Sequence, residues 1–138
     1  MIECLPDVVP FFVAKTLMEY LKKQGVAIWV VTGSSQEKFL DALLNDFEGY
    51  VSADQIITGN DVRHGKPNPE PYLLALKKSG FNSGEVIVIE NAPLGIQSAK
   101  AAGIFTVAIN TGILDDSILW DSGADRVFKD WNELKAEI

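Results

Sequence analysis

The sequence has almost no cysteine, no long apolar run and no excess of positive charge. Cys4 is the only cysteine among 138 residues, which excludes an intramolecular disulfide and a zinc site built from several cysteines. Nineteen acidic residues against twelve basic ones give a net charge of −7, and an acidic surface repels nucleic acid and anionic lipid. No apolar stretch approaches membrane-spanning length, and the first twelve residues lack the basic start of a signal peptide. These absences predict a cytoplasmic protein with no nucleic-acid or membrane partner.

What the sequence does contain is an alternation of strand and helix patterns. Apolar runs predict strands at residues 26–31, 55–58, 86–89, 104–109 and 126–128. Helical periodicity and end signals predict helices at residues 15–24, 37–47, 69–79, 94–102, 115–121 and from 131 onward. Such alternation indicates parallel β-α-β units. We expect residues 1–138 to form one α/β domain, a three-layer Rossmann-like core with a mainly parallel sheet and an irregular segment at residues 1–14.

In such sheets the ligand site lies beyond the carboxyl ends of the strands, and that rule selects three places. At the first, Thr32, Gly33 and Ser34 lie between a strand end and a helix start. A hydroxyl, a glycine that lets backbone come close and a helix N-terminus together could cradle a phosphate. The alternative is a plain strand-to-helix turn, in which Ser34 and Glu37 form a capping box.

The second and third places carry charge. Lys66 stands before a helix start stiffened by prolines, which restrict the backbone around it; the alternative is a solvated lysine. Glu90 and Asn91 end a buried strand, and their oxygens suit a hard cation such as Mg²⁺. Alternatively, Asn91 caps the next helix while Glu90 pairs with Lys66.

Together and in this order, the three segments resemble motifs II, III and IV of the haloacid dehalogenase superfamily. The closest similarity is to its β-phosphoglucomutase-like and phosphoglycolate-phosphatase-like branch, and it extends from about residue 15 to the end. The matching segments are Thr32-Gly33-Ser34, Gly65-Lys66-Pro67-Asn68-Pro69-Glu70-Pro71-Tyr72 and the stretch from Ile89-Glu90-Asn91 to Gly103-Ile104.

The resemblance implies a role for each candidate residue. Thr32 and the Gly33 amide would bind the transferring phosphoryl group, with Ser34 and Ser35 available to contact the substrate. Lys66 would neutralise the phosphoryl charge and hold the nucleophile, and Glu90 and Asn91 would lie on or beside Mg²⁺. These are the parts that phosphoryl transfer needs, because its catalysis is mostly positioning and electrostatic stabilisation. His64 is expected to be a solvated loop residue.

Two parts of the family pattern are absent from the sequence. Family members begin with a strand ending in Asp-x-Asp, which supplies the nucleophile and the general acid/base, and this branch usually adds a helical cap domain that selects the substrate. Asp7 has no second aspartate two residues on and is expected to be a surface residue. With Asn91 where aspartate is common, Glu90 is the one certain anionic ligand, so we expect weak or absent Mg²⁺ binding by this chain alone.

The absent strand also leaves a gap in the expected sheet. In the family it lies centrally, between the strands that correspond to residues 26–31 and 86–89. Two apolar strand edges facing a gap invite pairing. Residues 8–14, or a segment of a second copy in a homo-oligomer, could shield or fill this gap. Pro10 limits the pairing of residues 8–14 as a central strand.

The sequence thus predicts a haloacid-dehalogenase-like hydrolase core, a Mg²⁺-dependent phosphatase or phosphomutase by resemblance, that is inactive alone. The ligand expected is a small phosphorylated metabolite. The alternatives are a non-catalytic remnant that binds a phosphorylated ligand or a protein, and one half of a split enzyme. A flavodoxin-like or receiver-like domain would explain the alternation of elements but not the motifs around Lys66 and Glu90.

Overall fold

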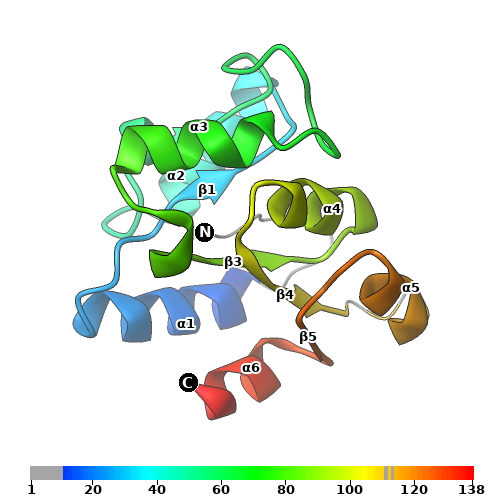
Figure 1. Ribbon diagram of the computed structural model, residues 1–138. Helices are drawn as coiled ribbons and strands as arrows, with labels where there is room; N and C mark the ends of the chain where they lie inside the picture. Colours follow the sequence, from blue (N-terminus) through cyan, green and yellow to red (C-terminus); the bar gives the residue numbers. More distant parts are fainter. Residues whose placement is uncertain (1–10, 111, 113) are drawn as a thin grey trace.

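Short parallel strands form the centre of the fold, with helices packed on both sides (Figure 1). The computed structural model describes residues 11–110, 112 and 114–138. Within these residues the strands are β1 (Val30–Val31), β2 (Ile56–Ile57), β3 (Ile87–Glu90), β4 (Phe105–Ile109) and β5 (Arg126–Phe128).

The strands fall into two hydrogen-bonded groups. β1 pairs with β2, and β3, β4 and β5 pair in that order, every pair being parallel. In the described part of the chain, no strand pair joins β1 to β3. The break lies between the two segments predicted to flank the absent central strand, residues 26–31 and 86–89. Because every strand pair is parallel and helices alternate with the strands along the chain, the predicted α/β fold with a parallel sheet is confirmed.

Helices cover both faces of the strands. One layer contains α1 (Phe11–Lys23), α2 (Glu37–Asp46) and α6 (Trp131–Glu137); the other contains α3 (Glu70–Ser79), α4 (Pro93–Ala101) and α5 (Asp116–Asp121). The single 3₁₀ turns η1 (Ala53–Gln55) and η2 (Ser83–Glu85) lead into β2 and β3. None of the helices described is long and apolar enough to cross a membrane.

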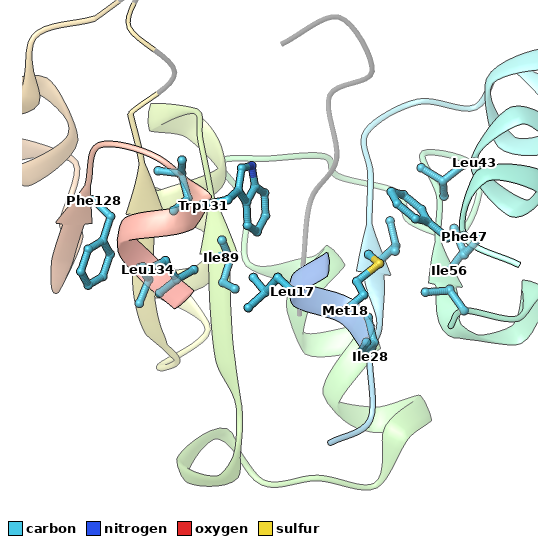
Figure 2. Packing of buried hydrophobic residues seen from close by; sticks show 14 residues of the cluster. Leu17, Met18, Ile28, Leu43, Phe47, Ile56, Ile89, Phe128, Trp131 and Leu134 are labelled. Carbon is cyan, nitrogen blue, oxygen red and sulfur yellow. The ribbon is translucent and has the colours of Figure 1, made fainter. Parts of the chain in front are cut away.

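The core divides according to the two-residue period of the strands. On the side of α1, α2 and α6, a large buried cluster includes the strand residues Val30, Ile56, Ile89 and Val107 (Figure 2). Their neighbours along the strands, Val31, Ile57 and Val88, belong to a second buried cluster on the side of α3 and α4. Burial on both faces explains why these strands read as continuous apolar runs rather than as alternating ones.

Two predicted boundaries differ from the structure at the start of the chain. Helix α1 begins at Phe11, so residues 11–14, predicted to be irregular and to shield or fill the sheet gap, form its first turn and do not pair as a strand. A proline restricts the residue before it rather than the one after it, so Pro10 in the sequence does not prevent this earlier start. Asp7 and residues 8–10 lie outside the described residues. The first strand is shorter than predicted, because only residues 30–31 pair with the two-residue strand β2.

A partly buried carboxylate ties helix α4 to strands β4 and β5. Asp125 accepts hydrogen bonds from the Lys100 ammonium and from the backbone N–H of Thr106, each at 2.8 Å. Burial by itself raises the pKa of Asp125, but the bonds from Lys100 and Thr106 outweigh it and hold the pKa below its ordinary value. The ionised carboxylate therefore stabilises the fold.

We expect Asp125→Asn to weaken the acid dependence of stability. A carboxylate with a lowered folded-state pKa contributes stability that is present above its unfolded pKa, about 3.9, and is lost as pH falls through the folded pKa. The variant should be about 1 kcal/mol less stable than the wild type at neutral pH, and this difference in stability should shrink as the pH falls. Urea unfolding from neutral pH to about pH 3 measures both effects. Asp121→Asn, at the exposed end of α5, is the control; parallel curves for wild type and Asp125→Asn would refute the expectation.

Candidate functional site

The three segments selected from the sequence meet at the carboxyl ends of β1 and β3. Lys66 joins them: its ammonium lies 2.7 Å from Glu90 Oε1 and donates to the backbone carbonyl of Val31 at 3.2 Å. Thr32 directly follows Val31, and Asn91 directly follows Glu90. The Lys66 side chain is 10% exposed and that of Glu90 is fully buried. The lysine is therefore a fixed charge at the edge of the sheet rather than a solvated one.

The backbone after β1 forms a turn braced by its own side chains and by the chain after β2. The Thr32 hydroxyl oxygen accepts from the Ser34 N–H at 3.1 Å, and the Thr32 N–H donates to Ile57 O at 2.9 Å. The Gly59 N–H donates to Ser34 O at 3.1 Å, and a Cβ at Gly59 would lie 2.5 Å from Gly33 O. Gly59 thus allows this close approach. Gly33 is exposed, with open space where a Cβ would lie.

The capping box predicted from Ser34 and Glu37 does not form. The N-cap of α2 is Gln36, whose side chain makes no capping bond, and Ser34 Oγ accepts from the Gln36 N–H at 3.3 Å instead. The helix starts later than the box requires, because Ser34 belongs to the turn that follows Thr32. Ser35 is exposed beside it.

The loop that carries Lys66 is held by a residue that the sequence did not single out for a role. The Glu70 carboxylate accepts from the backbone N–H groups of Arg63 and His64, each at 2.8 Å, and lies 3.1 Å from the His64 ring. The two backbone hydrogen bonds lower the pKa of Glu70 below its ordinary value, with the His64 ring adding to the effect. The His64 side chain is otherwise largely exposed. Glu70, the first residue of α3, therefore anchors the loop at Arg63 and His64, and His64 lies two residues before Lys66.

Glu90 is buried completely and is held from two sides. Besides Lys66, the hydroxyl of Tyr72 on α3 donates to Glu90 Oε1, and Tyr72 is itself fully buried. On the other side, a Cβ at Gly95 would lie 2.1–2.2 Å from the Glu90 carboxyl atoms. A buried carboxylate requires such partners, since an isolated charge in the interior is costly. The glycine in α4 provides the space in which the carboxylate lies.

The two alternatives weighed for Glu90 and Asn91 have different outcomes. Glu90 does pair with Lys66. Asn91 does not cap α4, whose N-cap is Ala92 without a side-chain bond. The Asn91 side-chain oxygen is buried, and no hydrogen bond from the described residues reaches it. The Asn91 side-chain oxygen and the carboxylate of the preceding residue, Glu90, are oxygen ligands of the kind that a hard cation prefers. No group of three or more His, Cys, Asp or Glu residues that could hold a metal occurs in the described part of the chain.

Comparison with known proteins gives the family. A family model described as haloacid dehalogenase-like hydrolase matches residues 3–109. The chain therefore belongs to the haloacid dehalogenase-like hydrolases, and the resemblance seen in the motifs is confirmed.

Individual relatives agree with this assignment. The chain is 32% identical to validoxylamine A 7'-phosphate phosphatase of Streptomyces hygroscopicus subsp. limoneus over 131 residues. This alignment covers 95% of this chain and 60% of that protein. The chain is 31% identical to the phosphorylated carbohydrates phosphatase of Thermotoga maritima, over 81% of this chain and 52% of the relative. A putative β-phosphoglucomutase from Bacteroides vulgatus superimposes with a TM-score of 0.84 at 46% identity, over 91% of this chain and 50% of that one. The chain thus spans roughly half the length of these relatives.

We expect Gly95→Ala to displace the Glu90 carboxylate, because the added Cβ would overlap it. Overpacking of this kind costs about 1–3 kcal/mol, and the loss should appear as a lower midpoint in urea unfolding. Gly84→Ala is the matched control: Gly84 is exposed in η2, has no positive φ and has no atom within 4 Å of its added Cβ. Equal stability of the two variants would contradict the contact between Gly95 and Glu90.

Proposed function

We propose that this chain is the phosphate-binding core of a phosphatase or phosphomutase that acts on a small phosphorylated carbohydrate or a related metabolite. The observation that carries the proposal is the largely buried Lys66 ammonium, held beside the Thr32 turn by Glu90 and Val31 O. In a chain of net charge −7, an anionic ligand needs such a local positive charge, because the overall field does not attract it.

The roles proposed for the site residues follow from their positions. Thr32, Gly33 and Ser34 would offer hydroxyl and backbone N–H groups to the phosphoryl oxygens, and Lys66 would balance their charge. The substrate class is supported by the relatives, whose names specify validoxylamine A 7'-phosphate, phosphorylated carbohydrates and 2-deoxyglucose-6-phosphate.

A magnesium ion belongs to the proposal only as a weakly bound partner. Glu90 and Asn91 would hold it, since the buried Asn91 oxygen lies next to a carboxylate in the sequence and has no donor among the described residues. Bound there, Mg²⁺ would neutralise charge on the phosphoryl oxygens. The Lys66 ammonium lies 2.7 Å from Glu90 Oε1 and repels a second cation at that oxygen, which weakens the site.

We further propose that the chain alone binds phosphate without turning over a phosphoester. The family nucleophile lies in an Asp-x-Asp sequence, and no Asp-x-Asp occurs anywhere in the 138 residues. Without a nucleophile, the covalent route has no first step. Turnover would then require an aspartate-bearing strand from outside these 138 residues, as in a split enzyme. A non-catalytic remnant that binds a phosphorylated ligand or a protein is the competing outcome.

We expect inorganic phosphate to bind to the wild-type chain and to bind roughly 10–100-fold more weakly to a variant without the Lys66 charge, because charge-assisted hydrogen bonds contribute about 1.5–3 kcal/mol. Calorimetry on Lys66→Ala measures this loss of phosphate affinity. The double variant Lys66→Met, Glu90→Gln is measured in the same way and leaves no buried carboxylate uncompensated. Lys77→Ala, on the exposed side of α3, is the control.

Hydrolysis of p-nitrophenyl phosphate with Mg²⁺ separates binding from turnover in the same proteins. We expect no turnover by the wild type above that of Lys66→Ala. Turnover abolished by Lys66→Ala would show that this chain does contain a nucleophile, and the proposal of binding alone would be wrong. Absence of both phosphate binding and turnover would favour the protein-binding remnant.

Magnesium affinity is expected to be millimolar or weaker, and Asn91→Asp should tighten it because the substitution adds a second carboxylate at the same place. Isothermal calorimetry measures both values. Asn132→Asp adds the same charge on the exposed side of α6 and should change nothing. Submillimolar binding by the wild type would contradict the proposal of a weak site.

A further inference from the structure

Tyr72 contacts both members of the buried ion pair. Its side chain is fully buried in the cluster that contains Val31, Val88 and Ala99. Its hydroxyl donates to Glu90 Oε1, the same oxygen that the Lys66 ammonium approaches at 2.7 Å. Its ring centre lies 5.2 Å from that ammonium, within the range of a cation–π interaction.

These contacts restrict the ion pair from three directions. Two donors on the same oxygen oppose rotation of the Glu90 carboxylate about its last bond. Gly95 leaves room for the carboxylate but brings the backbone of α4 against it. The Tyr72 ring lies beside the Lys66 ammonium and limits where the flexible lysine stem can place its charge. A phenylalanine would fill the same space and keep the ring, but it would remove one of the donors.

We propose that Tyr72 is a positioning residue for the Lys66–Glu90 pair: its hydroxyl orients the carboxylate and its ring locates the ammonium. Tyr72 acts through these two side chains and does not itself contact a ligand. The inference rests on the proposed function, because Lys66 and Glu90 are the groups proposed to receive the phosphoryl oxygens and the metal.

The test compares Tyr72→Phe with Tyr50→Phe in the full chain. Tyr50 also has a lysine ammonium near its ring, that of Lys22 at 5.7 Å, but belongs to the other core cluster. In the ligand-free proteins, NMR follows the Glu90 carboxyl carbon and the proton exchange of the Lys66 ammonium. These signals report on the ion pair itself, which a purely structural role for the hydroxyl would leave unchanged.

For Tyr72→Phe we expect a shifted Glu90 carboxyl signal, Lys66 proton exchange at least about threefold faster, and phosphate affinity lower by about three- to tenfold, the range for one hydrogen bond of about 0.7–1.4 kcal/mol. Tyr50→Phe should change none of the three. Unchanged Glu90 and Lys66 signals in a folded Tyr72→Phe would overturn the inference.

The two proposals fail separately. If wild type binds no phosphate while the Glu90 and Lys66 signals move in Tyr72→Phe, the proposed function is wrong and the positioning role stands. If Tyr72→Phe does not fold, replacing the three tyrosines with 3-fluorotyrosine tests the same bond, because the more acidic phenol is a stronger donor. The Glu90 signal should then move, and a stationary signal would refute the positioning role.

Discussion

The ion pair between Lys66 and Glu90 links parts of the chain that are far apart in the sequence. Lys66 belongs to the loop before α3, Glu90 ends β3, and Lys66 also bonds the carbonyl at the end of β1. Both charges are largely withdrawn from water, so neither is stable there without the other. Removing one partner of a buried pair typically costs about 3–5 kcal/mol. The pair therefore fixes the arrangement of the whole site.

Several otherwise unrelated features support that pair. Gly95 leaves the space that the Glu90 carboxylate occupies, and Tyr72 donates to the same carboxylate. Glu70 holds the loop that presents Lys66 by accepting two backbone hydrogen bonds. None of these three residues needs to touch a ligand. Each limits the freedom of a charge at the site proposed to bind phosphate.

The strands β1 and β3 are not paired with each other, and the chain spans roughly half the length of the relatives. Both facts bear on whether these residues could cleave a phosphoester or only bind phosphate. Packing nevertheless continues across the break, because each of the two buried clusters contains strand residues from both groups. The proposed phosphate binding would use groups on both sides of the break, Thr32 after β1 and Lys66 paired with Glu90 at the end of β3. The proposed cleavage of a phosphoester would need in addition an aspartate in the family's Asp-x-Asp form, which the 138 residues do not contain.

Much of the fold and the choice of site could be predicted from the sequence, because strand runs, helix periods and motif order are local signals. These gave the parallel α/β class, the three segments at the carboxyl ends of the strands, and most element boundaries to within about two residues. The start of α1 at Phe11 and the short β1 could not be predicted. The length of β1 depends on its two-residue partner β2, which lies elsewhere in the sequence. The sequence by itself determined which residues carry charge and hydrogen-bonding groups. Only the tertiary structure decided that Tyr72 and Gly95 converge on Glu90, because those contacts form between separate elements and leave no periodic trace along the chain.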